Sequence, residues 1–187
     1  RDAAKRLIGT IAHPLNAPIL NEKHTRVARG YGLLQPRILV KHESLYRSRL
    51  SYWFAGVTGI DPYTFAISDP YQDLFGHGIF TGKGIYDVAV FDKILSQRFP
   101  DNTVLSHDLL EGGFLRAGLV TDIELMDDFP SNYYSYLKRM CRWVRGDWQL
   151  LRWFSPLVRN RRGTRLWVDL PIITRWQMID NLRRSLL

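Results

Sequence analysis

The chain contains the stretch Leu105-Ser106-His107-Asp108-Leu109-Leu110-Glu111-Gly112, in which an apolar run of helical period follows a serine. Serine is a favoured N-cap residue, so we predict that Ser106 caps a helix over residues 107–116. Gly118 is the predicted stop signal after this helix. Residues 119–126 then alternate apolar and polar side chains, which predicts a strand. This mixture of helix and strand indicates the α/β class.

Helical and strand-like patterns alternate along the rest of the chain. Residues 33–40 are an apolar run typical of a buried strand, in which Pro36 indicates a bulge or an edge position. Periodicity and end signals predict further helices over residues 3–12, 43–54, 87–95 (capped by Asp87), 131–154 (one long helix, or one broken near Gly146) and 171–187. We therefore expect a mixed sheet with flanking helices.

Three details of this assignment can be checked in a structure. The helix at residues 43–54 should turn Tyr46 and Trp53 inward. Residues 60–84 are rich in Gly and Pro and are typical of a long functional loop. Residues 159–164 are predicted to form a basic loop.

The composition is that of an ordinary globular chain. A length of 187 residues suits one domain with a substantial core, and 45% apolar residues can fill it. The lone Cys141 excludes an internal disulfide and fits a reducing compartment. No apolar run is long enough to span a bilayer. The start at Arg1-Asp2, without Met, suggests a fragment of a longer protein.

The net charge of +8 is concentrated near the C-terminus, where eight arginines face two aspartates after Gln149. We therefore divide the chain into residues 1–155, which form the main domain, and a basic amphipathic tail, 156–187. A basic end fits nucleic acid, an anionic membrane surface or a phosphorylated substrate. The last helix can lie on a membrane surface or pack on the domain as an ordinary surface helix.

Asp108 is the strongest candidate for proton transfer. Its place in the first turn of a helix stabilises the carboxylate anion, which can accept a proton from an attacking hydroxyl group. The same placement also suits a purely structural helix start. Glu111 lies on a similar face and can orient an acceptor or pair with Arg116. His107 is either a second proton-handling group or a structural residue.

A second stretch mixes aromatic, cationic and acidic side chains, namely Arg142, Trp143, Arg145, Asp147 and Trp148. Arginine suits bidentate contact with phosphate, and indole rings stack on sugar rings. Arg139 extends the series at a spacing of three residues. The alternative is an amphipathic helix with tryptophans in the core and solvated arginines.

The segment Gly82-Lys83-Gly84, followed by Tyr86, resembles a phosphate-binding loop only in part, because it lacks the spacing of a P-loop. Its glycines permit a close approach of the backbone to another group. Neither paired cysteines nor clustered histidines suggest zinc. No nucleic-acid recognition motif accompanies the basic tail, so we expect no nucleic-acid partner.

Seven strings spread over the chain resemble the cyclic β-1,2-glucan synthases. They are GYGLLQPR at 30–37, TGIDPYT at 58–64, YQDLFG at 71–76, FTGKGIYDV at 80–88, LSHDLLEG at 105–112, RWVRGDWQ at 142–149 and DNLRRSL at 180–186.

The resemblance implies a fragment of a very large protein of the bacterial inner membrane. Its glycosyltransferase domain would face the cytoplasm, have a GT-A-type fold related to cellulose synthase, and extend β-1,2-glucan from UDP-glucose with inversion. The implied partners are UDP-glucose, β-1,2-glucan, the remainder of the parent polypeptide and an anionic membrane surface.

The resemblance also implies roles for residues. The acidic pair of the wider class falls on His107-Asp108, which gives Asp108 the role of base although the first member is histidine. The Q-x-x-R-W motif falls on residues 139–143, with Arg139 in place of glutamine. Arg142 and Trp143 would then contact the donor diphosphate and the acceptor sugar. Further contacts with donor or acceptor are expected from Gly82, Lys83, Tyr86, Glu111, Arg145, Asp147 and Trp148.

The metal site of this class, for Mg or Mn, belongs to a D-x-D motif that is expected upstream of residues 3–12. The fragment alone should therefore be inactive. Two other classes remain open from the residues alone. One is a non-catalytic carbohydrate- or membrane-binding module, and the other is a nucleic-acid-binding protein.

Overall fold

Two long parallel strands, β3 (Leu33–Val40) and β5 (Ala117–Asp127), form the centre of the fold in the computed structural model, which describes residues 2–55 and 69–186. The short strand β4 (Ile85–Tyr86) pairs antiparallel with β3 and gives the order β4-β3-β5. The predicted mixed sheet is therefore confirmed. The string at 58–64, and part of the loop at 60–84, lie outside the described residues.

The bulge expected at Pro36 is present. Pro36 pairs with Val120, whereas Arg37 pairs with Glu124, so β5 contributes extra residues at this point. Proline has no backbone N–H to give to a ladder, and a bulge accommodates that loss. The amide of buried Gln35 donates to the Pro36 carbonyl at 2.7 Å.

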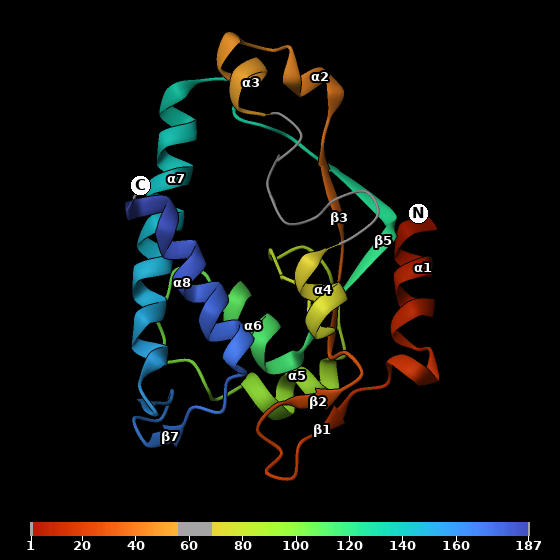
Figure 1. The fold of residues 1–187 in the computed structure, drawn as a ribbon, viewed down its shortest axis with the longest axis vertical. Coiled ribbons are helices and arrows are strands. Elements are labelled where there is room, and N and C mark those ends of the chain that lie inside the picture. The colour runs from red at the N-terminus through yellow and green to blue at the C-terminus, as the bar shows by residue number, and fades with distance from the viewer. Residues whose placement is uncertain (1, 56–68, 187) are drawn as a thin grey trace.

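Alternating side chains of β3 and β5 feed two cores, one on each face of the sheet. On one face Leu7 of α1 (Asp2–Ile11) packs with Leu34, Val120 and Ile123. The other face is covered by α5 (Val88–Leu95), α6 (Asp108–Leu115), α7 (Tyr133–Leu150) and α8 (Ile172–Leu186). Figure 1 shows α1 on one side of the two long strands and α6, α7 and α8 on the other. The result is three layers, with the candidate residues on the side of α6 and α7.

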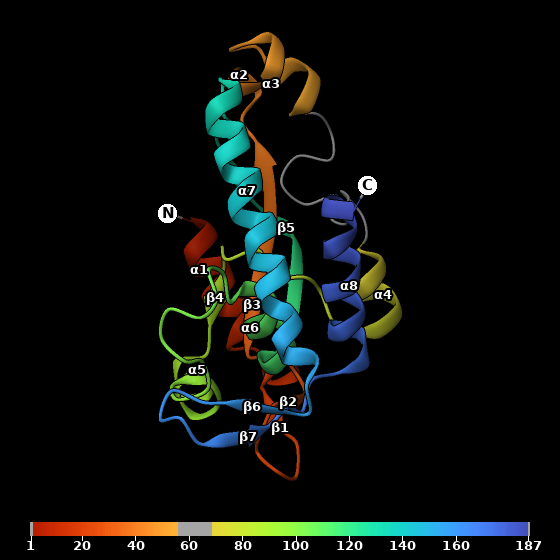
Figure 2. The same ribbon diagram turned by 90° about the vertical axis from the view of Figure 1, so that its left-hand side faces the viewer.

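Shorter elements connect these layers. They are the 3-10 helices η1 (Pro14–Asn16) and η2 (Leu151–Phe154), the helices α2 (His42–Leu45), α3 (Arg49–Phe54) and α4 (Pro70–Phe75), and the antiparallel pairs β1 (Ile19–Leu20) with β2 (Val27–Arg29) and β6 (Leu157–Arg159) with β7 (Arg165–Trp167). Figure 2 shows α7 running along much of the height of the molecule, from the α2–α3 end toward β6.

The single helix predicted at residues 43–54 is wrong, because the structure has two short helices there. Ser48 starts the second one, accepting a hydrogen bond from the Ser51 backbone in a capping box. Tyr46 and Trp53, predicted to point inward, are 64% and 77% exposed. A local capping signal therefore outweighs the helical period that continues across it.

The structure corrects the predicted start of one helix and decides between two alternatives for another. His107, not Ser106, is the N-cap of α6, and its side chain makes no capping hydrogen bond. Of the two alternatives for residues 131–154, the structure shows the unbroken helix, because α7 continues through Gly146. One glycine costs a helix only about 1 kcal/mol relative to alanine, and Gly146 lies where Ser106 approaches the helix.

Residues 156–187, assigned to a basic tail, share the main core. Val158, Val168, Leu170 and Met178 belong to the same cluster as Phe114. The basic loop predicted at 159–164 includes the connection of the β6–β7 hairpin, which the sequence did not indicate. No helix in the described part of the chain is long and apolar enough to cross a membrane. Contact of this tail with a membrane surface stays a prediction.

Candidate functional site

Asp108 is the first residue of α6 and is partly exposed. Its carboxylate therefore lies at the positive end of the helix dipole, as predicted, and still reaches solvent. His107 precedes it, and its ring stacks on Phe99 with 4.7 Å between centroids and 8° between planes. This contact favours the structural role for His107.

The backbone of Gly82 lies directly against the Asp108 carboxylate. A Cβ added to Gly82 would be 2.9 Å from Oδ2 and 3.1 Å from Oδ1 of Asp108. Gly82 also has a φ of +82°, which favours glycine. Two residues that the sequence singled out separately are therefore neighbours.

The turn that carries Gly82 is fixed on both sides. Thr81 donates from its backbone N–H and its hydroxyl to Gln35 Oε1, at 3.0 and 3.2 Å. The Lys83 ammonium forms an ion pair with Asp127 at the end of β5. Burial, the largest single effect, raises the pKa of Asp127, but the hydrogen bonds from Lys83 and the Asp128 backbone, together with the charges of Lys83 and Arg139, outweigh it, so the pKa lies below its ordinary value. Lys83, a candidate phosphate ligand, is thus already engaged by a carboxylate.

Glu111 lies one helical turn after Asp108. Burial, followed by the charge of Asp108, raises the pKa of Glu111 from 4.5 to about 7. The alternative of pairing with Arg116 does not match the hydrogen bonds of that guanidinium, which donates to the carbonyls of Gly76 and Ala28 at 3.0 and 2.8 Å. Asp108 and Glu111 therefore form a coupled acidic pair.

The two stretches that carry most of the predicted site residues, 105–112 and 142–149, do meet. The Leu105 N–H donates to Gln149 Oε1 on α7 at 2.8 Å. A Cβ on Gly146 would be 4.0 Å from the Ser106 Cβ. These contacts place the segment before Asp108 on the second half of α7.

The side chains of α7 divide between different faces. The Arg139 guanidinium lies 5.8 Å from the centroid of the half-buried Trp143, and its charge also lowers the pKa of Asp127. Residues four apart share a helix face, so Trp143 lies on the same face of α7 as Arg139. Arg142 is exposed.

The remaining predicted residues take other positions. Arg145 is exposed and Asp147 is buried. Trp148 donates from Nε1 to Ser185 Oγ of α8 at 3.1 Å, so its indole turns toward that helix. The ring of Tyr86 packs 5.1 Å from the centroid of Phe91. The acidic pair and the Gly82 turn thus form the centre of the site, and Arg139 lies near the Lys83–Asp127 ion pair beside it.

Sequence reasoning missed three residues of this arrangement, namely Gln35, Thr81 and Asp127. Gln35 carried a usable signal, because a polar side chain inside an apolar strand must find hydrogen-bond partners when buried. Asp127 carried none, since its partner is 44 residues away in the chain.

Within residues 2–55 and 69–186, no three His, Cys, Asp or Glu side chains gather in a group that could hold a metal ion. The predicted Mg or Mn site was placed upstream of this chain and stays a prediction.

Comparison with known proteins relates the sequence of the chain to a glucan synthase. The chain is 47% identical, over 188 residues, to the cyclic beta-(1,2)-glucan synthase NdvB of Rhizobium meliloti (strain 1021). The match covers 100% of the chain and 6% of that protein, so the chain corresponds to a small segment of its relative. The resemblance indicated by the motifs is confirmed. No protein-family model matches the chain.

Proposed function

We propose that the chain is the acceptor-side part of a glycosyltransferase domain that extends β-1,2-glucan from UDP-glucose. The observation that carries the proposal is the position of Asp108, whose partly exposed carboxylate lies at a helix start between Gly82 and Glu111. The match to a cyclic β-(1,2)-glucan synthase supports the substrate class. A GT-A-type fold and a place at the cytoplasmic face of the bacterial inner membrane belong to the same proposal.

The reaction is an inverting displacement. Asp108 takes the proton of the 2-hydroxyl of the terminal glucose while that oxygen attacks the anomeric carbon of the donor. The new C–O bond forms as the bond to uridine diphosphate breaks, and the diphosphate leaves with the electron pair. A divalent metal held by another part of the parent protein would stabilise the charge of the leaving group.

Neighbouring residues support this chemistry. Trp143, half-buried beside Arg139, offers an indole edge for the acceptor sugar, and the exposed Arg142 is available to the diphosphate. Glu111, with a pKa of about 7, is partly protonated at neutral pH and can donate a hydrogen bond to Asp108 or to an acceptor hydroxyl.

The helix α8 fits the proposed contact with an anionic membrane surface. Ile172, Trp176 and Ile179 are exposed along it, close in sequence to the exposed Arg183. Apolar side chains flanked by arginine favour the interface of a bilayer with anionic lipids.

The decisive experiment is Asp108→Asn in the intact synthase. Removal of a general base should lower glucan formation by roughly 10²–10⁴-fold. The matched control is Asp101→Asn, because Asp101 is an exposed surface residue paired with Arg161. Turnover by Asp108→Asn at the rate of the control would remove Asp108 from the role of base.

One observation favours the second candidate function, a non-catalytic carbohydrate-binding module. Tyr46, Tyr52 and Trp53 are exposed at the α2–α3 end, and the centroids of neighbouring rings are 6.1 Å apart. Exposed rings of this kind can stack on sugar units. Loss of glucan binding on substitution of Tyr52 and Trp53 by alanine, with Asp108→Asn still active, would favour this function.

A further inference from the structure

We propose that the turn from Thr81 to Gly84 is a positioning device for the base, in which buried Gln35 holds the turn so that Gly82 fixes the Asp108 carboxylate. The inference rests on the proposed function, because it requires that Asp108 reacts. It adds Gln35, Thr81 and Gly82 as positioning residues that do not themselves touch the reacting atoms.

The first step is the contact itself. Asp108 is the first residue of its helix, where its side chain has solvent on one side. The Gly82 backbone closes another side, because a Cβ at this position would lie 2.9 and 3.1 Å from the two carboxylate oxygens, closer than side chains normally pack. Backbone atoms at this distance limit the rotamers that the Asp108 side chain can adopt.

The second step is that the turn carrying Gly82 is held rigidly. Gln35 is 2% exposed, and both ends of its amide are engaged. Its Nε2 donates to the Pro36 carbonyl at the bulge, and its Oε1 accepts from the N–H and the hydroxyl of Thr81. The bond to Pro36 is buried and the two bonds from Thr81 are partly buried, so water competes little with them and they fix the start of the turn on β3.

The far side of the turn is fixed to the sheet as well. Lys83 is paired with Asp127 at the end of β5. Gly84 lies so close to β3 that an added Cβ would overlap the Leu34 carbonyl oxygen. Residues on both sides of Gly82 are therefore tied to the two central strands, and Gly82 between them contacts Asp108 at the start of α6.

Through this turn, the central sheet determines the position of the Asp108 carboxylate. A general base must lie within hydrogen-bond reach of the proton that it removes, and a displacement of about 1 Å can lower turnover by about 10²-fold. Small changes in the turn should therefore alter the rate of the chemical step more than the affinity for the donor.

The chain offers a matched pair of glycines for the test. Gly82 and Gly163 have φ angles of +82° and +79°, so alanine meets a similar backbone strain at both. An added Cβ contacts Asp108 at position 82 and nothing within 4 Å at position 163. In the intact synthase, Gly82→Ala should lower kcat by about 10²-fold with KM for UDP-glucose within about twofold of the parent. Gly163→Ala should leave both within about twofold.

A second pair keeps the test decisive if Gly82→Ala fails to fold. Thr81→Val removes the hydroxyl that donates to Gln35, and Thr81→Ser restores it, while Gly82 stays in place. We expect a loss of about tenfold in kcat for the valine variant and recovery to near the parent rate for serine. Equal rates for valine and serine, or Gly82→Ala as active as Gly163→Ala, would overturn the inference.

The Asp108→Asn variant separates the two possible failures. If it keeps the parent rate, Asp108 is not the base and the proposed function fails. If it is inactive while Gly82→Ala matches Gly163→Ala, the base stands and only the positioning role of the turn is wrong.

Discussion

Glu111 and His77 are two largely buried ionisable side chains whose pKa values the fold shifts in opposite directions. Burial and the Asp108 charge raise the pKa of Glu111 to about 7, and burial with the charges of Arg116 and Arg26 lowers the pKa of His77 to about 4. Both shifts disfavour the charged form, as expected for groups removed from water. Each one links the free energy of unfolding to pH.

Glu111→Gln should reduce the loss in the free energy of unfolding that the parent shows as the pH rises from 4.5 toward 8. Between pH 4.5 and 7 the folded chain keeps a proton on Glu111 that the unfolded chain has lost, so the free energy of unfolding falls as the pH rises. The glutamine variant should gain stability relative to the parent at pH 8, on the order of 2–3 kcal/mol. Urea unfolding at pH 5 and pH 8 measures this, with Glu22→Gln, an exposed loop residue, as the control. If the free energy of unfolding changes equally between pH 5 and pH 8 in the parent and in Glu111→Gln, the carboxyl of Glu111 is not buried as the structure shows.

His77→Gln should act in the opposite sense. Between pH 4 and 6.5 the unfolded chain binds a proton on His77 that the folded chain excludes, so the parent loses stability as the pH falls through this window. The variant should lose less, which urea unfolding at pH 4.5 and 7 would show. The exposed His24→Gln is the control and should keep the parent's loss. The same loss in His77→Gln would mean that His77 is accessible to protons.

Helix starts show, at the scale of elements, what the sequence can and cannot predict. Asp87 was recognisable as a cap, because the bond it accepts from the Val90 N–H at 3.0 Å is local. The sequence could not show that Ser106 does not cap α6, because the segment around it is held by a distant residue, Gln149 of α7. The β3 strand followed from its apolar run, whereas the turn over Asp108 depends on Gln35 and Asp127, which are distant in the chain. Local signals therefore predicted most elements, and long-range contacts assembled the site.

Alanine substitutions at the two predicted caps should differ in their cost. Asp87→Ala removes a capping bond and should lower the free energy of unfolding by about 1 kcal/mol. Ser106→Ala removes no cap of α6 and should cost less than about 0.5 kcal/mol. Urea unfolding at pH 7 compares them directly. A larger loss for Ser106→Ala would mean that Ser106 does start the helix.

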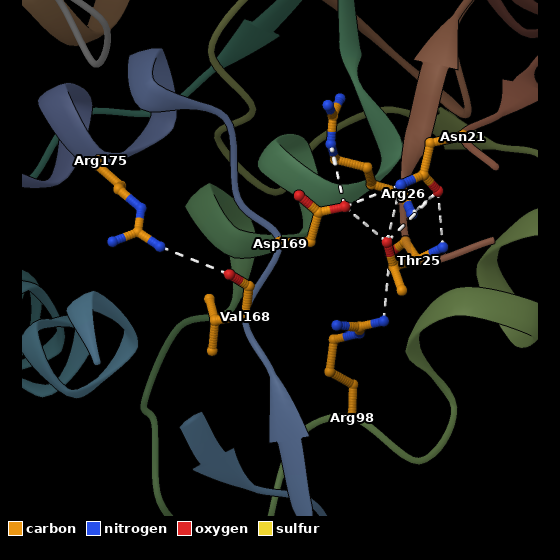
Figure 3. Close-up of polar contacts among 7 residues, drawn as sticks. All are labelled: Asn21, Thr25, Arg26, Arg98, Val168, Asp169 and Arg175. Carbon is orange, nitrogen blue, oxygen red and sulfur yellow. Dashed lines mark hydrogen bonds and ion pairs between the residues drawn. The ribbon is translucent and has the colours of Figure 1, made fainter. Parts of the chain in front are cut away.

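At the scale of the whole molecule, one polar cluster joins the connection between β1 and β2 to the segment just before α8. Asp169, just before α8, accepts hydrogen bonds from Asn21 and Thr25 at 2.8 and 2.7 Å and pairs with Arg26 at 3.5 Å. The nearby Arg98 donates to the Thr25 carbonyl at 3.2 Å (Figure 3). None of these contacts was predicted, because the partners lie up to 148 residues apart in the chain.

We expect loss of this cluster to destabilise the whole chain in a single unfolding transition. Asp169→Ala leaves the donors of Asn21, Thr25 and Arg26 without their shared acceptor, which should cost about 2–4 kcal/mol. Asp101→Ala breaks only an exposed pair with Arg161 and should cost less than about 1 kcal/mol. Because residues 156–187 share the main core, loss of Asp169 should lower the midpoint of one cooperative transition, followed by tryptophan fluorescence and circular dichroism together. Two separate transitions in Asp169→Ala would instead show that the C-terminal segment unfolds as a unit of its own.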